Sequence, residues 1–383
     1  MTRGRRSASF PAGMANNPYG RLLYGALERL GYERVEGGTL ESGWLREHRA
    51  AVGWLHLHWD ELEYESEGGA LASWLALARY GARLAAARAL GYRIAWTIHE
   101  VLPRETRSVR RDLVAAKLRA SLAHVLIAHD RATAGRAARV IGRLAERVHV
   151  VPHGSYAGVY LARRPREEVR ASLGLEPGAR VFLCFGHLRA FKEVELLLDA
   201  FAGLRRAEAR LLVVGEFAWR VQDEPWERAL ARRLARTAAA DPRLSVRLGF
   251  VPEEEVGDLF AAADVVVSPR GDGWTSGSLI LALSQRKPVI AARREAYAEL
   301  VPPDAGWLFV PHDPAALTAA LDAAAAASEQ RLASMGEAAA AVAASLSWEA
   351  AARRIAALFE AVLPARGSGE RGASAARGRT GRP

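Results

Sequence analysis

The stretch DVVVSPRGDGWTSGSLILALSQRKPVIA, residues 264–291, decides the fold class. It opens with an apolar strand pattern that ends at Pro269 and continues through a glycine-rich polar loop. An apolar helix pattern then begins at about Ser276–Gly277, and a second apolar run follows at residues 288–291. A strand, a helix and a strand in this order predict two parallel strands joined by a right-handed crossover.

The same alternation extends in both directions from this stretch. Short apolar runs, continuous rather than alternating as in strands buried on both faces, recur at residues 53–57, 93–98, 124–128, 148–151, 181–185 and 211–214. We therefore expect an α/β protein with two doubly wound parallel-sheet domains that face each other.

Changes in composition predict the boundaries between these parts. We expect a first domain at 14–162, a polar linker at 163–180 and a second domain at 181–346. The amphipathic pattern at 347–363 predicts a final helix. Residues 1–13 and the Gly-, Ser- and Arg-rich residues 364–383 are expected to be flexible, basic ends.

Composition narrows the class of protein. Hydrophobic residues are 50% and charged residues 25% of the 383, which excludes bulk disorder. No apolar run approaches the ~18 residues of a membrane span, and the first residues lack the apolar core of a secretory signal. Because Cys184 is the single cysteine, an internal disulfide is impossible, and we expect a cytoplasmic protein.

The net charge of +10 lies mostly at the two ends of the chain. Residues 1–13 carry +3 and residues 364–383 carry +4, which leaves about +3 for the remainder. No basic-aromatic stripe or nucleic-acid-binding motif accompanies this charge, so we expect no nucleic-acid partner.

Common cofactor and hydrolase motifs are missing. No G-x-G-x-x-G, Walker A or G-x-S-x-G pattern follows a predicted strand. His56 and His58 share a strand face, but no third ligand follows at metal-binding spacing, so we predict no metal site and no bound cofactor.

Histidines gather at the predicted carboxyl ends of strands. These are His58, His99, His129, His153 and His187. Ligands of open α/β sheets bind at that edge, so these side chains either line a site or are satisfied by neighbouring carbonyls.

Two segments of the second half are suited to an anion. The turn Thr275-Ser276-Gly277-Ser278 offers hydroxyls and free N–H groups at a helix start, which fits either a phosphate site or an ordinary serine N-cap. The loop after residues 181–185 carries Arg189 and Lys192, which would clamp a pyrophosphate together with that turn or lie solvated at a helix start.

Together these segments resemble the retaining glycosyltransferases of family 4, with the GT-B fold, over residues 17–363. The resemblance rests on the order and spacing of several short markers, which are Asn17-Pro18-Tyr19, Leu55–Trp59, Trp96–Glu100, Val151–Tyr156, the Arg189/Lys192 loop, Thr275–Ser278, and Lys287–Ala291 with Glu299. It implies two Rossmann-like domains, with the acceptor bound by the first and a nucleoside-diphosphate sugar by the second. It also implies that Arg189, Lys192 and the Thr275–Ser278 turn bind the donor phosphates and that His99, as the catalytic candidate, lies near the transferred sugar. The last helix, led by Trp348, would return to the first domain.

The sequence departs from this family at the donor sugar. The family has two glutamates eight positions apart before the K-P-V segment, and Gly273 and Leu281 occupy these positions here. Asp272 is the nearest acid, which makes it a donor-binding candidate. His187 replaces the usual arginine after the loop glycine.

The prediction is a cytoplasmic, metal-independent glycosyltransferase that uses a nucleotide sugar and a glycan, lipid or small-molecule acceptor. Retention of anomeric configuration follows from the resemblance alone. Two alternatives stay open: a sugar-nucleotide epimerase of the same fold, and a non-catalytic sugar-nucleotide-binding subunit, which the missing glutamates favour.

A basic segment suggests a partner on the acceptor side. Residues 104–119 carry a local +4, and the helix pattern at residues 71–90 carries Arg79, Arg83 and Arg88 beside apolar positions. This combination fits either a solvated helix face or weak contact with the inner face of an anionic membrane.

Overall fold

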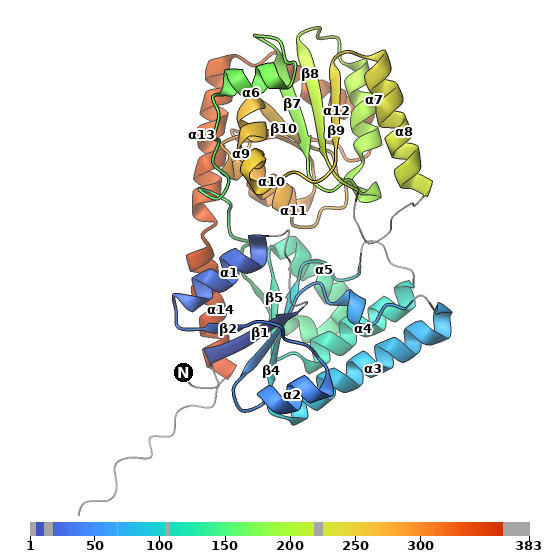
Figure 1. Cartoon of the computed structure of the whole chain (residues 1–383), viewed down its shortest axis with the longest axis vertical. Coiled ribbons are helices and arrows are strands. Elements are labelled where there is room, and N and C mark those ends of the chain that lie inside the picture. The colour runs from blue at the N-terminus through green and yellow to red at the C-terminus, as the bar shows by residue number, and fades with distance from the viewer. Residues whose placement is uncertain (1–4, 11–17, 67, 104–107, 218–224, 363–383) are drawn as a thin grey trace, which may run out of the picture.

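A computed structural model of the chain describes residues 5–10, 18–66, 68–103, 108–217 and 225–362. The strands form two parallel six-stranded sheets, one in each of two lobes that are stacked along the long axis of the molecule (Figure 1). The predicted α/β class with two doubly wound units is therefore confirmed.

The lower lobe in Figure 1 is built on the sheet β2-β1-β3-β4-β5-β6. Its strands are β1 (Arg6–Phe10), β2 (Glu33–Val35), β3 (Trp54–Leu57), β4 (Arg93–Ile98), β5 (Val125–Ala128) and β6 (Val148–Val150). Its helices are α1 (Pro18–Glu28), α2 (Ser42–His48), α3 (Gly69–Ala89), α4 (Val109–Leu122), α5 (Arg131–Ile141) and α14 (Trp348–Val362).

The upper lobe is built on the sheet β12-β11-β10-β7-β8-β9. Its strands are β7 (Arg180–Phe185), β8 (Ala209–Gly215), β9 (Leu244–Leu248), β10 (Val265–Ser268), β11 (Val289–Ala292) and β12 (Gly306–Phe309). Its helices are α6 (Arg166–Ser172), α7 (Val194–Gly203), α8 (Pro225–Ala240), α9 (Glu253–Ala262), α10 (Gly277–Ser284), α11 (Glu295–Leu300), α12 (Pro314–Ala325) and α13 (Glu329–Ser345).

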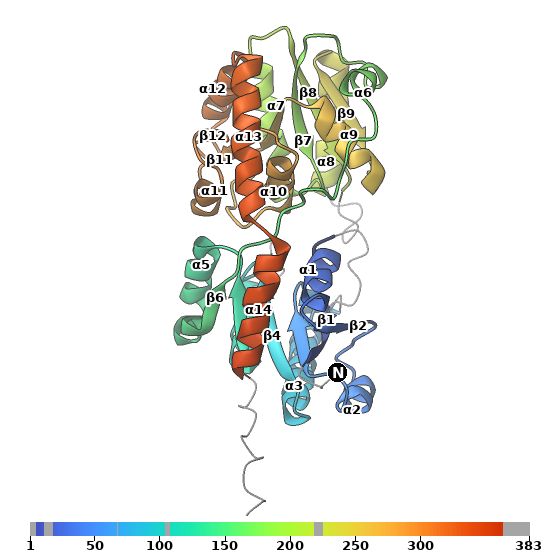
Figure 2. The ribbon, with the colours of Figure 1, turned by 90° about the vertical axis from the view of Figure 1, so that its left-hand side faces the viewer.

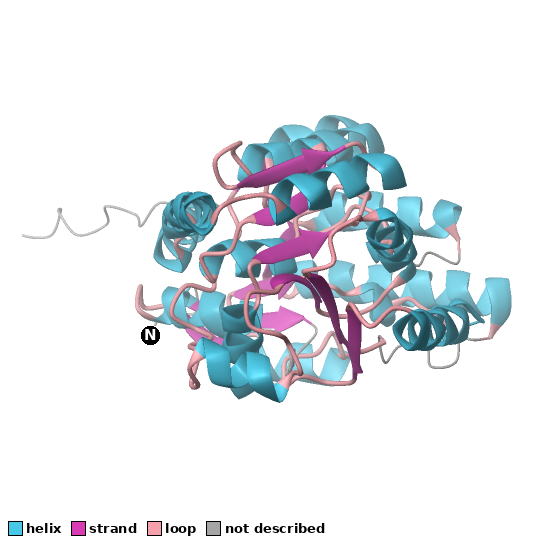
Figure 3. Cartoon of the chain, turned by 90° about the horizontal axis from the view of Figure 1, so that it is seen from above, coloured by secondary structure: helices cyan, strands magenta, loops and turns pink. Residues whose placement is uncertain are grey.

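Helices cover both faces of each sheet, as the view from above shows (Figure 3). The strands β3, β5, β10 and β11 are buried at every residue, which explains why their sequences are continuous apolar runs. Each sheet has a hydrophobic core on either side, so the four core clusters come in two pairs.

The last two helices connect the lobes. Helix α13 lies on the upper lobe, and the chain then descends into α14, which packs against α1 on the lower lobe (Figure 2). The crossing point is fixed by two hydrogen bonds, from the Ser155 N–H to the Leu346 carbonyl at 2.6 Å and from the Trp348 indole N–H to the Ser155 carbonyl at 2.6 Å. A Cβ at residue 154 would lie 2.2 Å from the Trp348 ring, so only glycine fits there.

The expectation of a flexible N-terminus at 1–13 is wrong for residues 6–10. These residues form β1, which pairs in parallel with β2 and β3. Of the arginines that suggested a solvated tail, Arg5 directly precedes the strand and Arg6 begins it and forms an ion pair with Glu33. Residues 1–4, part of the predicted N-terminus, and the predicted tail at 364–383 lie outside the described residues.

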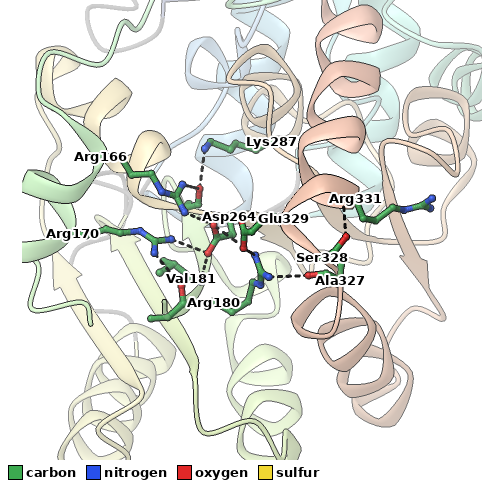
Figure 4. Close-up of polar contacts among 12 residues, drawn as sticks. Arg166, Arg170, Arg180, Val181, Asp264, Lys287, Ala327, Ser328, Glu329 and Arg331 are labelled. Carbon is green, nitrogen blue, oxygen red and sulfur yellow. Dashed lines mark hydrogen bonds and ion pairs between the residues drawn. The ribbon is translucent and has the colours of Figure 1, made fainter. Parts of the chain in front are cut away.

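The segment 163–180, predicted to be a polar linker, contains α6, which packs against α9. The buried Asp264 carboxylate holds it through Arg166 and Arg170, and also accepts the Val181 N–H at 2.7 Å (Figure 4). Arg166 and Arg170, which lie in the segment predicted to be a linker, therefore hold this segment on the upper lobe. A buried carboxylate such as that of Asp264 is stable only when it is paired.

Candidate active site

The order of the upper sheet creates a crevice at its carboxyl edge. The chain enters at β7 and continues to β8 on one side, and later to β10 on the other, so the space beyond β7 and β10 is a topological switch point. A small pocket lies there, lined by Lys192, Ser278, Ser268 and Arg270.

Lys192 reaches this crevice from the loop that follows β7. Its Nζ lies 3.1 Å from the point that a Cβ on Gly186 would occupy, and Gly186 itself has φ +105°. Glycine at 186 thus leaves room for the ammonium group above the end of β7. Burial, and to a smaller extent the charges of Lys192 and Arg189, lower the pKa of His187 to about 4. The two cations make the loop electropositive.

The turn Thr275–Ser278 is already partly engaged by the protein. The Ser276 hydroxyl accepts the Leu279 N–H at 3.3 Å as the N-cap of α10, and lies 3.1 Å from the Ser278 hydroxyl. The Thr275 hydroxyl donates to Asp130 of the other lobe. Gly277 is the first residue of α10, close to the Tyr156 hydroxyl. Of these four residues, Ser278 is the one that lines the pocket with Lys192.

Asp272 pairs with an arginine that the sequence analysis missed. The Arg270 guanidinium, buried over the ring of Phe191, donates to both carboxylate oxygens of Asp272 at 2.8 and 2.6 Å. Coulombic interactions with Tyr297, Asp272 and Glu100 oppose burial and raise the pKa of Arg270. The hydrogen bonds from Thr275 to Asp130 and from Arg136 to the Asp272 carbonyl, which join the two lobes, show that the two edges face each other. Arg270 lies two residues after the buried strand β10, a position that could have indicated its role.

The loop around Asp272 also contacts the lower lobe directly. Arg136 of α5 donates to the Asp272 carbonyl at 2.9 Å and lies 4.7 Å from the centre of the Trp274 ring. Because Asp130 at the start of α5 accepts from Thr275, the helix holds this loop at both ends.

Gly273 and Leu281, which occupy the positions of the two missing glutamates, have structural surroundings of their own. Gly273 has φ +70°, and a Cβ there would lie 2.6 Å from the Arg136 guanidinium and 3.0 Å from Arg294. Leu281 is buried in the upper core on α10. A side chain at 273 would have to displace the Arg136 guanidinium, and the side chain at 281 lies in the apolar core.

The lower lobe presents aromatic and imidazole rings at the facing edge. His99 follows β4 and stacks on Trp59 with ring centres 3.7 Å apart. It lines a small pocket together with Glu100 and Arg119. The Tyr19 ring lies at the centre of this edge, with ring centres 5.0–5.6 Å from those of His58, Trp59, His99, His129, His153 and Trp348.

Four of the five strand-end histidines therefore meet, as the sequence predicted, and His187 lies on the upper lobe. Burial lowers the pKa of His153 to about 3, and lowers the pKa of His58 and His99 well below the usual 6.5. The same holds for His56, whose pKa falls to about 3. The histidines of this edge are consequently uncharged at neutral pH, although Glu100 and Arg119 lie beside them.

The basic segment at 104–119 is less exposed than expected. Arg111 and Arg119 are 1% and 4% exposed and form ion pairs with Asp112 and Asp60. Arg110 and Lys117 are exposed, whereas Arg104 and Arg107 lie outside the described residues. The sequence could not separate these groups, because burial depends on how α4 packs.

Within the described parts of the chain, no three His, Cys, Asp or Glu side chains are grouped so that they could hold a metal ion. In the same residues, no helix is long and apolar enough to cross a membrane.

Comparison with known proteins agrees with this geometry. The family described as "Glycosyl transferases group 1" matches residues 179–326. A GDP-mannose:glycolipid 4-beta-D-mannosyltransferase of Xanthomonas campestris pv. campestris is 31% identical over 265 residues, which cover 67% of this chain and 66% of that protein. A D-inositol 3-phosphate glycosyltransferase of Segniliparus rotundus is 29% identical, and the match covers 62% of this chain and 52% of that protein. The chain thus spans just under two thirds of the first relative and about half of the second.

Among solved structures, HepE of Anabaena in complex with UDP and glucose has a TM-score of 0.71 at 18% identity, covering 94% of this chain and 100% of that chain. WaaG, a glycosyltransferase involved in lipopolysaccharide biosynthesis, has a TM-score of 0.61 at 16% identity, covering 92% of this chain and 99% of that chain. These likenesses establish a shared fold.

Proposed function

This chain belongs to the group 1 glycosyltransferases with the GT-B fold, and from that premise we propose that it transfers a sugar from a nucleoside-diphosphate sugar to an acceptor. One observation carries the proposal: the cationic pocket lined by Lys192 and Ser278 at the switch point lies on a lobe edge that faces the edge of His99.

The chemistry follows from that arrangement. A diphosphate gathers negative charge as its bond to the sugar breaks, and Lys192, Arg189 and the start of α10 stabilise that charge. Ser278 contributes a hydroxyl to the same pocket. Because these groups are cationic or hydrogen-bond donors already, the proposed mechanism needs no divalent ion.

Turnover assays test the proposal. UDP-glucose, GDP-mannose and related donors would be incubated with glycan, glycolipid and small-molecule acceptors, and released nucleoside diphosphate would be measured. Diphosphate release that requires both a donor and an acceptor supports a transferase. Conversion of the donor alone supports the epimerase alternative, and binding without turnover across the panel supports a non-catalytic subunit. Lys192→Ala should abolish turnover, whereas Arg236→Ala, an exposed change on α8, should leave it unchanged.

The stereochemical outcome is a finer part of the proposal. Retention is what the family resemblance implies. The Xanthomonas relative is named for a β-linked mannoside, and Gly273 and Leu281 leave no carboxylate at the two expected positions, which favours inversion as the second candidate. NMR of the product's anomeric proton, with an α-configured donor, distinguishes an α product from a β product.

We further propose that the acceptor is a glycolipid presented by an anionic membrane. Leu71, Trp74 and Leu75 are 74%, 41% and 49% exposed on α3, and Val109 and Val114 are exposed on the adjacent α4. The two helices pack so closely that a Cβ on Gly81 would lie 2.8 Å from Leu118. Figure 1 shows these helices on the outer side of the lower lobe.

Exposed cations flank this apolar surface, namely Arg79 on α3 and Arg110 and Lys117 on α4. A bilayer with negative charge fits this surface. The apolar side chains would enter its headgroup region, and the neighbouring cations would attract its anionic lipids. Curated relatives that act on glycolipid and lipopolysaccharide core acceptors are consistent with this location.

Vesicle sedimentation of the full chain at ~0.15 M salt tests the membrane proposal, because loose charge attraction is largely screened there. Phosphatidylglycerol vesicles should sediment the protein, and Trp74→Ala should reduce the bound fraction. Phe250→Ala is the matched control, since Phe250 is 53% exposed on the other lobe. Protein that stays in the supernatant would favour a water-soluble acceptor.

A further inference from the structure

A chain of hydrogen-bonding groups leads from the core of the lower lobe to the cleft. The Tyr24 hydroxyl lies 3.2 Å from His58 Nε2, and His58 Nδ1 lies 3.1 Å from His99 Nε2. Both nitrogens of His58 and one nitrogen of His99 are thus engaged. Among the described residues, the second nitrogen of His99, Nδ1, has no hydrogen-bond partner, and His99 lines a pocket at this edge.

These imidazoles are neutral, because burial and the neighbouring histidines lower the pKa of His58 and of His99. A neutral imidazole has one N–H donor and one bare acceptor nitrogen. The direction of one hydrogen bond in the chain therefore sets the direction of the next. His99 Nδ1 is a donor in one arrangement and an acceptor in the other.

A neighbouring pair of the same kind has a direction that the backbone decides. His129 Nδ1 lies 3.0 Å from the Val151 carbonyl, which can only accept, so the proton is on Nδ1. His129 Nε2 must then accept from the Tyr19 hydroxyl at 3.2 Å. In this pair the phenol donates to the imidazole.

The surroundings of Tyr24 favour the same direction. The Arg34 guanidinium lies 5.3 Å from the centre of the Tyr24 ring and withdraws electron density from it. A phenol polarised in this way is a better donor and a poorer acceptor. Arg34 also disfavours a proton charge on His58.

We propose that Tyr24 and His58 are positioning residues for His99. The Tyr24 hydroxyl donates to His58 Nε2, the His58 Nδ1–H donates to His99 Nε2, and His99 presents its Nδ1–H to a hydroxyl oxygen of the sugar bound in the cleft. Only the identity of that ligand rests on the proposed function; the tautomer belongs to the protein alone.

Such an arrangement suits recognition of a neutral sugar. The His99 ring is held by stacking on Trp59 and by the edge of Tyr19, with ring centres 3.7 and 5.0 Å away. A hydrogen-bond donor group whose orientation and protonation are fixed before the ligand arrives costs little free energy to order on binding.

The tautomer can be measured directly in the intact protein. Two-dimensional ¹H–¹⁵N spectra of histidine-labelled protein distinguish an Nδ1–H from an Nε2–H imidazole, and the His99 signals are assigned by their loss in His99→Gln. We expect His99 in the Nδ1–H form at pH 7.5 without any ligand. An Nε2–H form would overturn the proposal, whether or not the protein shows transferase activity.

Variants then test which groups set that tautomer. Tyr24→Phe should convert His99 to a mixture of tautomers and raise the KM for the sugar nucleotide ~5-fold with kcat little changed, because a binding contact is no longer preorganised. Tyr19→Phe, the matched loss of a phenol from the carbonyl-anchored pair, should leave the His99 tautomer as it is. His58→Asn, whose amide replaces Nδ1, should preserve it, and His58→Leu should not. A His99 tautomer that is indifferent to Tyr24→Phe and His58→Leu would refute the positioning role, and the wild-type spectrum decides the direction even if a variant fails to fold.

Discussion

The two edges of the cleft achieve polarity by opposite means. The upper edge carries permanent charges. Lys192 and Arg189 lie in the loop after β7, and the Arg270–Asp272 pair lies in the glycine-rich loop after β10. The lower edge uses neutral rings, with His58 and His99 kept uncharged by burial. Under the proposed function, the charges of the upper edge would hold a diphosphate, whereas uncharged hydrogen-bonding groups would be sufficient to orient sugar hydroxyls at the lower edge. The comparison explains why the lower edge was harder to interpret from residue types alone.

Acid should reveal the largest difference between the edges. His56 and His153 have a folded-state pKa of about 3 against about 6.5 in the unfolded chain. Above pH 6.5 neither state is protonated; below it the unfolded chain takes up protons that the folded chain refuses. Stability should therefore fall as pH drops from 6.5 toward 3, by up to about 1.4 kcal/mol per pH unit for each of these histidines.

Urea unfolding at pH 7 and pH 5 checks this slope. His56→Gln should flatten it, whereas His149→Gln, an exposed change on β6, should leave it as in the wild type. A free energy of unfolding that is independent of pH over this range would contradict the burial of neutral imidazoles.

Removing a charge should affect the upper edge alone. Lys192→Ala and Arg189→Ala should each weaken binding of UDP or GDP by about 1.5–3 kcal/mol, the size of a charge-assisted hydrogen bond. Calorimetry on folded protein measures the loss, with Arg236→Ala as the control. If neither change alters affinity for either diphosphate, these two residues do not form the clamp.

Restoring a family carboxylate should do harm. Gly273→Glu places a side chain at φ +70° against Arg136, so we expect about 1–2 kcal/mol of destabilisation and no gain in turnover. Gly158→Glu is the matched control, because Gly158 has φ +77° and open space around it. Equal losses in both variants would mean that Arg136 contributes nothing beyond backbone strain, and a gain in turnover would show that position 273 can still serve the donor sugar.

The smallest expected effect is that of chelation. EDTA should leave turnover unchanged, because protein cations take the place that a divalent ion would have beside the diphosphate. Activity lost in EDTA and restored by Mn²⁺ or Mg²⁺ would show that the charge at the upper edge is incomplete without a metal.

Much of the fold could be predicted because local sequence patterns determine it. The buried strand at 265–268, the serine cap at 276 and the helix that follows were read from period, turn residues and capping. The prediction for residues 6–10 failed because arginines beside a five-residue strand resemble a solvated tail. The prediction of a linker around α6 was wrong for a related reason. The arginines of α6 pair with Asp264, which lies about 95 residues further along the chain.

The candidate site divides in the same way. That Lys192, Ser278 and His99 lie at carboxyl ends of parallel strands follows from strand order and a right-handed crossover. That Thr275 bonds Asp130 and Arg136 bonds the Asp272 carbonyl could not be read, because each contact joins residues more than 130 positions apart in different lobes.

The sequence by itself therefore determined the two parallel sheets and the residues that end their strands, because periodicity and turn chemistry act between near neighbours. The tertiary structure alone decided which of those residues are charged, free or already bonded. Arg119 of α4 is buried in the lower lobe and His99 is held by His58, and both outcomes depend on how distant elements pack and exclude water.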